Sequence, residues 1–113
     1  MFYRKRKNKY NAVKTKIGDL SFDSRKEAVR YQELLHLEKT GEIFDLEIHP
    51  KYVLAVNDCK ICSYIGDFQY HTKGGALVVE DVKGGGRKGT LTPAARLKHK
   101  MMLAIHGIEV RIV

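Results

Sequence analysis

The clearest hydrophobic pattern in the chain has the spacing of a helix and covers about residues 24–39. Its apolar positions are Ala28, Tyr31, Leu34, Leu35 and Leu37. Ser24 stands at its start, and Gly41 follows as a residue that commonly ends helices. A second helix is predicted from the capping residue Thr92, with Pro93 at its first position, to about residue 106, where Gly107 ends it.

Extended segments separate the two predicted helices. Residues 43–56 are predicted to be extended, with Pro50 at an edge or bulge, and residues 61–70 form the next strand. A turn at residues 73–75 leads into a strand over residues 76–83, and a short strand over 108–113 completes the chain. The order helix, three strands, helix, strand predicts an α/β domain in which helices flank one mixed sheet.

The length of 113 residues fits a single domain. Residues 1–16 have no apolar period and are expected to form a flexible basic arm, while residues 17–113 form the folded domain. No apolar run is long enough to cross a membrane, and the N-terminus lacks the apolar stretch of a secretory signal. Two cysteines are too few for a disulfide scaffold, so we expect a cytoplasmic protein without a membrane partner.

The net charge of +8 is unevenly distributed. Residues 1–18 and 82–108 hold only basic charges, while residues 19–81 are acidic on balance. Two basic blocks around an acidic middle predict a polyanionic partner at a site that also contains carboxylates, the combination that a metal-dependent nuclease needs. The cations expected to contact phosphates are Arg4, Lys5, Arg6, Lys7, Lys9, Arg87, Lys88, Arg96, Lys98 and Lys100. A solubilising tail and a solvated helix face are the alternative interpretation of these charges.

Asp81 and Lys83 form an Asp-x-Lys pattern at the end of the third predicted strand. Residues two apart on a strand share a face, so these two side chains are expected on one side and Glu80 on the other. A carboxylate beside an ammonium group can hold a divalent metal and orient a water molecule next to it. A cross-strand charge pair at a sheet edge is the alternative.

Asp67 lies in the preceding, mostly apolar strand and shares a face there with Gln69. The turn between the two strands can bring Asp67 close to Asp81. Two converging carboxylates repel each other unless a cation lies between them, and Mg²⁺ binds through oxygen ligands of this kind. The alternative is that the Asp67 carboxylate accepts a hydrogen bond from turn backbone.

These motifs resemble the signature of the PD-(D/E)XK nuclease superfamily, in which Asp67 and then Asp81-Val82-Lys83 occupy consecutive strands of the core. The sequence of these motifs is more similar still to a family of small phage and prophage proteins that look like Holliday-junction-resolvase-type endonucleases. The resemblance covers roughly residues 10–113, and Gly66 stands where the superfamily name has proline. The matching residues are Tyr10-Asn11-Ala12, Phe22-Asp23-Ser24-Arg25-Lys26-Glu27-Ala28, Tyr64-Ile65-Gly66-Asp67-Phe68 and Val79-Glu80-Asp81-Val82-Lys83-Gly84.

The resemblance implies a restriction-endonuclease-like fold and a Mg²⁺-dependent endonuclease that cleaves branched DNA, with Mn²⁺ able to replace Mg²⁺. Asp67 and Asp81 would hold the metal, Glu27 would be a third ligand or position water, and the Val82 carbonyl would add a ligand. Lys83 would orient the attacking water or stabilise charge on the phosphorane. Glu27 also fits a capping box with Ser24, which leaves a structural role open.

Two other functions remain open at this point, a nonspecific DNA nickase and a non-catalytic DNA-binding protein of the same fold. A four-way junction has paired strands to be cut symmetrically, and a chain of this length supplies a single metal site. We therefore expect a homodimer, located in the cytoplasm of a bacterial host if the protein is phage-encoded.

Overall fold

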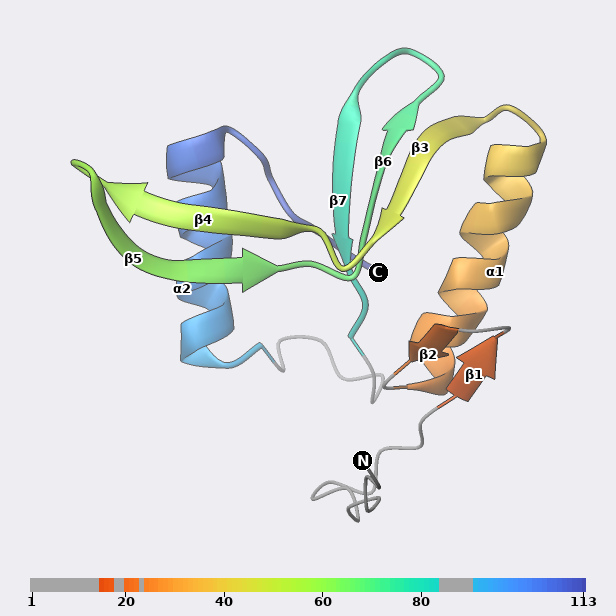
Figure 1. Ribbon diagram of the computed structural model, residues 1–113, viewed down its shortest axis with the longest axis horizontal. Coiled ribbons are helices and arrows are strands. Elements are labelled where there is room, and N and C mark those ends of the chain that lie inside the picture. The colour runs from red at the N-terminus through yellow and green to blue at the C-terminus, as the bar shows by residue number, and fades with distance from the viewer. Residues whose placement is uncertain (1–14, 18–19, 23, 84–90) are drawn as a thin grey trace, which may run out of the picture.

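The computed structural model describes residues 15–17, 20–22, 24–83 and 91–113, which form a mixed α/β fold (Figure 1). The strands are β1 (Thr15–Ile17), β2 (Leu20–Phe22), β3 (Ile43–Ile48), β4 (Lys51–Val56), β5 (Cys59–Ile65), β6 (Phe68–Thr72), β7 (Leu77–Asp81) and β8 (Arg111–Ile112). The helices are α1 (Arg25–Lys39) and α2 (Pro93–Met101), and α2 continues as a π-helical turn, η1 (Met102–His106). The prediction of an α/β domain is confirmed, although the described residues form eight strands where four were predicted.

The central feature is a four-stranded mixed sheet in the order β3-β6-β7-β8. Its first three strands are antiparallel, and β8 pairs parallel to β7. Strands β4 and β5 form a separate two-stranded sheet, as do β1 and β2. From α1 onward, the helices and the strands of the four-stranded sheet therefore follow the order α1, β3, β6, β7, α2, β8.

The two long strands predicted over residues 43–56 and 61–70 are each divided by a bend, which is a correction to the sequence analysis. Antiparallel pairing continues across this bend, from Ile48 opposite Phe68 to Lys51 opposite Ile65. Strands β3 to β6 thus form one ribbon that leaves the four-stranded sheet and continues as the β4–β5 hairpin (Figure 1).

Local backbone chemistry explains where the ribbon bends. His49 has a left-handed φ of 53°, and the next residue, Pro50, has no N–H to continue a strand ladder. The His49 N–H donates to the Asp67 carbonyl, and the Gly66 N–H donates to the Pro50 carbonyl, both at 2.9 Å. A Cβ atom on Gly66 would lie 3.1 Å from the side chain of Val79, a tight contact, so glycine favours the close approach of the two segments.

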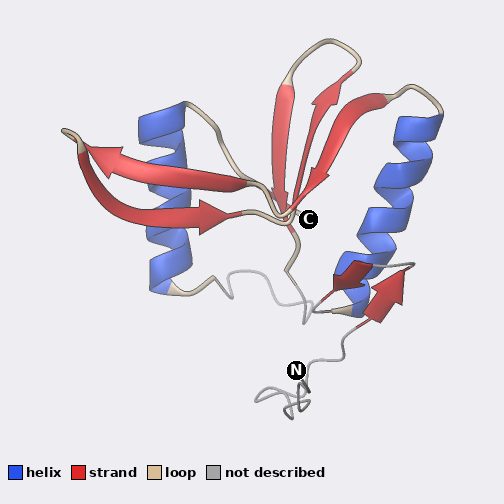
Figure 2. Cartoon of the chain, in the orientation of Figure 1, coloured by secondary structure: helices blue, strands red, loops and turns tan. Residues whose placement is uncertain are grey.

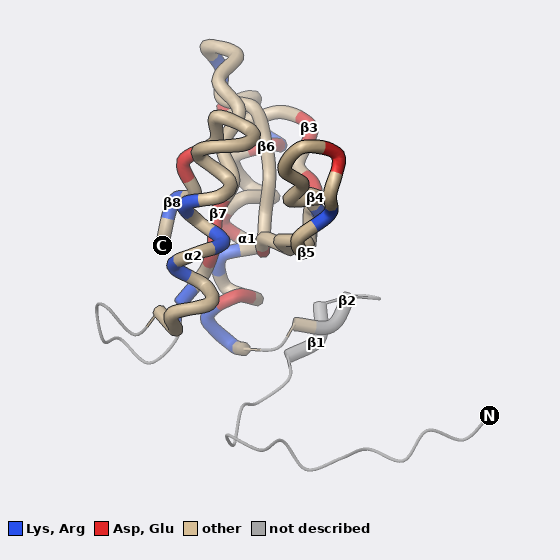
Figure 3. The backbone as a smooth tube through the Cα atoms, turned by 90° about the vertical axis from the view of Figure 1, so that its left-hand side faces the viewer, with Lys and Arg blue, Asp and Glu red and all other residues tan. Residues whose placement is uncertain are grey.

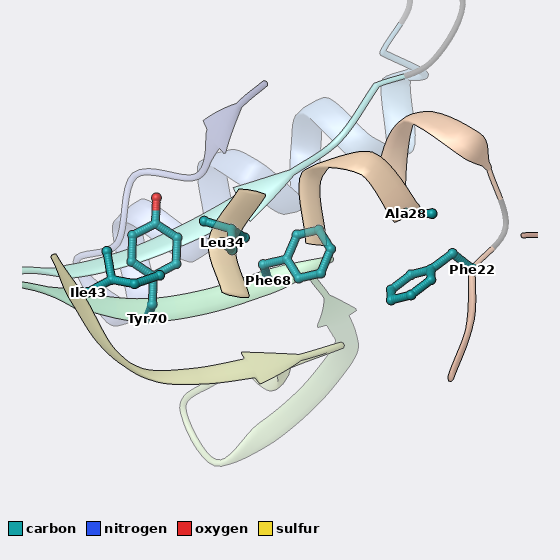
Figure 4. Packing of buried hydrophobic residues seen from close by; sticks show 6 residues of the cluster. All are labelled: Phe22, Ala28, Leu34, Ile43, Phe68 and Tyr70. Carbon is teal, nitrogen blue, oxygen red and sulfur yellow. The ribbon is translucent and has the colours of Figure 1, made fainter. Parts of the chain in front are cut away.

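Helix α1 packs against one face of the four-stranded sheet. Ser24 caps it, because its Oγ accepts a hydrogen bond of 3.1 Å from the Glu27 N–H, and Gly41 follows its end with a φ of 85°. Leu35, predicted on the apolar side of this helix, is 37% exposed. The buried residues between helix and sheet are Phe22, Ala28, Leu34, Ile43, Phe68 and Tyr70 (Figure 4).

Helix α2 lies on the opposite side of the sheet from α1 and also covers the β4–β5 hairpin (Figure 2). As predicted, Thr92 caps it through the Ala95 N–H, and Gly107 ends the η1 turn with a φ of 69°. The buried residues on this side are Leu54, Tyr64, Val79 and Met102. The last strand comprises only two residues of the predicted segment 108–113.

Most of the predicted basic arm, residues 1–14, lies outside the described part of the chain. Thr15 and Lys16, which were predicted to belong to the arm, instead begin β1. No helix in the described segments is long and apolar enough to span a membrane.

Candidate metal centre

Three carboxylates from distant parts of the chain approach one another where the ribbon bends. Asp67 lies in the bend, Asp81 is the last residue of β7, and Glu27 lies in the first turn of α1. Glu27 is 5% exposed and Asp81 is 8% exposed, while Asp67 is half-buried. Carboxylates at this depth are unfavourable unless protons, hydrogen-bond donors or cations compensate them.

Asp67 and Asp81 are hydrogen-bonded to each other through their side chains. Two carboxylates can share such a bond only while one of them carries a proton. Burial is the main cause that raises the pKa of Asp67 to about 8, and the bond to Asp81 and the charge of Glu27 act in the same direction. The Val82 N–H, which donates to Oδ2 of Asp67 at 2.6 Å, opposes this rise. The shared proton therefore belongs to Asp67.

Asp81 is the partner that stays ionised. Its Oδ2 accepts hydrogen bonds from the Tyr64 hydroxyl at 3.2 Å and from Nε2 of His99 at 3.1 Å, and it lies 3.1 Å from Nζ of Lys83. Burial by itself raises the pKa of Asp81, but the bonds from Asp67, Lys83 and His99 outweigh it, so that its pKa falls below the usual value. The pKa of Tyr64 is raised by burial and by the charge of Asp81, so the hydroxyl remains a donor.

Glu27 contributes a carboxylate oxygen that lacks compensation. Its Oε1 is buried and makes no hydrogen bond within the described structure, and Nε2 of His49 lies 3.9 Å from it. One ligand atom each from Glu27, His49 and Asp67 lie within 4.8 Å of one another. A buried oxygen without a donor, beside a second carboxylate and an imidazole, is a donor set that fits a divalent cation such as Mg²⁺ or Mn²⁺.

The cap at the start of α1 does not use the Glu27 carboxylate oxygen that faces this cluster. The observed cap bond runs from the Glu27 backbone N–H to the side chain of Ser24. The predicted capping role of Ser24 is confirmed, and the Oε1 atom of Glu27 remains available for another function.

Glu80 faces the opposite side of the sheet from Asp81, as the period of a strand predicts. It is fully buried, and its two oxygens accept hydrogen bonds from Nε and Nη2 of Arg30 at 2.8 and 2.6 Å. The Tyr70 hydroxyl is a further donor to the same carboxylate. Glu80 is therefore compensated by α1 and is not part of the candidate centre.

The structure places several predicted site residues differently from the sequence analysis. The prediction that Asp67 shares a strand face with Gln69 is wrong, because Asp67 precedes β6. Lys83 lies two residues beyond the end of β7, and its carbonyl accepts a bond of 2.6 Å from Nζ of Lys26. Val82 meets the cluster through its N–H, whereas the prediction concerned its carbonyl.

Of the predicted DNA-contacting cations, those on α2 can be placed. Figure 3 shows basic residues in blue along α2. Arg96 and Lys100 are exposed, and Lys98 is half-buried. The others, Arg4, Lys5, Arg6, Lys7, Lys9, Arg87 and Lys88, lie outside the described residues.

Sequence reasoning missed the two histidines of the cluster, His49 and His99. His49 precedes Pro50 in a segment predicted to be extended, and this dipeptide was the available signal for a bend. His99 follows the helical pattern of its neighbours, and its contact with Asp81 arises only from the packing of α2.

Comparison with known proteins identifies a family but no activity. The family model described as "Protein of unknown function (DUF1064)" matches residues 7–112. No curated protein and no solved structure matches the chain. The matched segment contains all the carboxylates of the candidate centre.

Proposed function

The chain belongs to the DUF1064 family of proteins of unknown function, and we propose from its site geometry that it is a metal-dependent endodeoxyribonuclease acting on branched DNA. The observation that carries the proposal is the approach of the Asp67–Asp81 carboxylate pair to the buried Oε1 atom of Glu27, which has no hydrogen-bond partner in the described structure. A divalent cation would compensate the oxygens of Asp67 and Glu27, which lie with a His49 nitrogen within 4.8 Å of one another, and would replace the proton that Asp67 shares with Asp81. Lys83, 3.1 Å from Asp81, adds the cation that phosphodiester chemistry needs next to a metal.

We assign the domain to the restriction-endonuclease-like fold. The order α1, β3, β6, β7, α2, β8 supports this assignment, since it is the α-β-β-β-α-β order implied by the resemblance of the sequence. In this assignment the β4–β5 hairpin is an addition between the first and second core strands.

Each residue of the centre has a chemical role in this proposal. When bound, a divalent cation lowers the pKa of a water molecule and neutralises charge on the scissile phosphate. Asp67 and Asp81 would hold that cation in place of their shared proton, and Glu27 would supply a third ligand or hold the water, with His49 beside it. Lys83 donates to the attacking water or to a phosphate oxygen whose charge grows during the reaction.

The exposed cations of α2 supply the phosphate contacts in this proposal. Arg96 and Lys100 are four residues apart on the helix and share one face, so both can follow a DNA backbone. Each phosphate that the protein neutralises adds about 0.9 to the slope with which the logarithm of the duplex-binding constant falls against the logarithm of salt concentration. The two free cysteines, Cys59 and Cys62, fit a reducing cytoplasm.

We also propose a homodimer, because symmetric cleavage of a junction needs two copies of this centre. Sedimentation at micromolar protein concentration measures this directly. A species of 12.9 kDa alone, with and without junction DNA, contradicts the proposal.

Cleavage of defined substrates tests the proposed activity. A four-way junction, a flap and plain duplex are incubated with Mg²⁺, Mn²⁺ or EDTA, using the parent protein and the variants Asp67→Asn and Asp81→Asn. We expect metal-dependent cleavage that favours the junction and is abolished in both variants. Equal cleavage of all three substrates identifies a nonspecific nickase instead. DNA binding without cleavage in any metal identifies a non-catalytic DNA-binding protein.

A further inference from the structure

Helix α2 directs one polar side chain into the interior, His99. The α2 residues are mostly exposed, and no residue from Pro93 to Met101 is fully buried. The side chain of His99 is nevertheless only 13% exposed, and its Nε2 lies 3.1 Å from Oδ2 of Asp81. Its neighbour Lys100 is exposed to solvent. His99 is therefore the residue through which α2 touches the carboxylate cluster.

The geometry determines where the proton of His99 resides. Oδ2 of Asp81 also faces the Tyr64 hydroxyl and the Lys83 ammonium group, so this oxygen is an acceptor and Nε2 of His99 carries the hydrogen. The ring also meets the ring of Tyr64 edge-on, with centroids 5.4 Å apart and planes at 88°. This contact fixes the plane of the imidazole, because Tyr64 is itself buried and hydrogen-bonded to the same oxygen.

Three donors thus converge on a single oxygen of Asp81, from Tyr64, His99 and Lys83. The other oxygen, Oδ1, accepts from none of these three. Rotation of the carboxylate would break all three interactions, so the two oxygens are not interchangeable. Oδ1 is the oxygen that remains for a cation.

We propose that His99 is a positioning residue, which together with Tyr64 holds Oδ2 of Asp81 and so leaves Oδ1 as the oxygen that would bind a cation. The proposal rests on the proposed function, since it assigns a role at the same centre. Hydrogen-bond partners of metal ligands orient those ligands, and their loss typically weakens metal affinity or activity by about ten- to a hundredfold. The role of His99 is to orient, because its Nε2 is bonded to Oδ2 of Asp81 and it acts through that carboxylate.

Two substitutions at this position separate the hydrogen bond from packing. His99→Leu introduces an apolar side chain of similar size and removes the donor. His99→Gln places an amide N–H near the position of Nε2 and should retain the bond. The matched control is His106→Leu on the adjoining η1 turn, where the histidine contacts the Val53 carbonyl and not Asp81.

The primary measurement is Mn²⁺ binding to the full chain by calorimetry, after circular dichroism has shown that each variant is folded. We expect His99→Leu to weaken Mn²⁺ binding about tenfold or more, His99→Gln to recover most of the affinity, and His106→Leu to match the parent. Tyr64→Phe removes the second donor and should weaken binding in the same way, which keeps the test valid if His99→Leu does not fold.

Two results overturn the positioning role. One is parent-like Mn²⁺ affinity in folded His99→Leu, or in Tyr64→Phe if His99→Leu does not fold. The other is a His99→Gln variant that binds as weakly as His99→Leu. A parent protein that binds Mn²⁺ but cleaves no DNA refutes the nuclease and leaves the positioning role testable by the same titrations. A parent that binds no Mn²⁺ overturns both proposals.

Discussion

The proton held between Asp67 and Asp81 predicts that the metal-free protein loses stability as the pH rises. An unfolded aspartate releases its proton near pH 4, whereas Asp67 in the folded protein retains its proton to about pH 8. The folded state therefore binds a proton that the unfolded state lacks. Its contribution to stability is fully present below pH 4 and disappears as the pH passes through 8.

The magnitude follows from the pKa. For a pKa of about 8, linkage gives a loss of roughly 3 kcal/mol in the free energy of unfolding between pH 6 and pH 9. Asp67 is half-buried, and screening by solvent reduces this to about 2 kcal/mol. For a domain of this size, that corresponds to a fall in Tm of about 10 °C. Saturating Mg²⁺ should remove the fall, because the cation binds best when the proton is gone.

The assay is thermal unfolding in EDTA at pH values from 6 to 9, with Asp67→Asn as the matched variant. An asparagine amide can donate to Asp81 and accept from the Val82 N–H, but it has no proton to lose in this range. The variant should therefore show a flatter profile than the parent, and the difference between the two curves reports Asp67 alone. If both profiles fall by the same amount, Asp67 does not hold the proton and the reasoning is refuted.

Three further predictions concern the neighbouring residues. Glu27→Gln should leave the Tm unchanged, because the cap uses its backbone N–H, yet lower the rate of Mg²⁺-dependent cleavage about a hundredfold. Ser24→Ala should lower the free energy of unfolding in urea by about 1 kcal/mol and leave the cleavage rate nearly unchanged. Arg30→Met should destabilise by about 3 kcal/mol in urea, because it leaves Glu80 buried and unpaired, and the double variant with Glu80→Met should recover much of that loss. Gly66→Ala should lower the free energy of unfolding in urea by about 1–3 kcal/mol and weaken Mn²⁺ binding, because its Cβ would lie 3.1 Å from the Val79 side chain and displace the bend. Unchanged stability would contradict this.

Local signals in the sequence predicted the helix ends and the faces of β7. Ser24 and Thr92 cap their helices where expected, because capping depends on residues only a few positions away. The alternation of Glu80 and Asp81 follows from the period of a strand, which needs no tertiary information. The division of the β3–β6 ribbon was missed, because an extended pattern does not encode the sheet to which each half belongs.

Only the part of the candidate centre that lies on strands adjacent in the sequence could be predicted. The approach of Asp67 to Asp81 follows from a hairpin between adjacent strands, and the structure has them in contact. The contacts of His99 and Arg30 join residues 18 and 50 positions apart and arise from helix packing, which the spacing of apolar residues does not specify. His49 reaches the cluster because the backbone turns at Pro50, a change of direction that side-chain patterns did not reveal.

The bent ribbon makes the length of the β4–β5 hairpin independent of the carboxylate cluster. The backbone bonds between His49 and Asp67 and between Pro50 and Gly66 close the ribbon before the hairpin begins. Residues inserted at the Asn57-Asp58 tip would extend an element that is already anchored at its base, without changing the spacing of the ligands. A longer or shorter hairpin would thus alter what the protein reaches, while the ligand geometry at the bend stays the same.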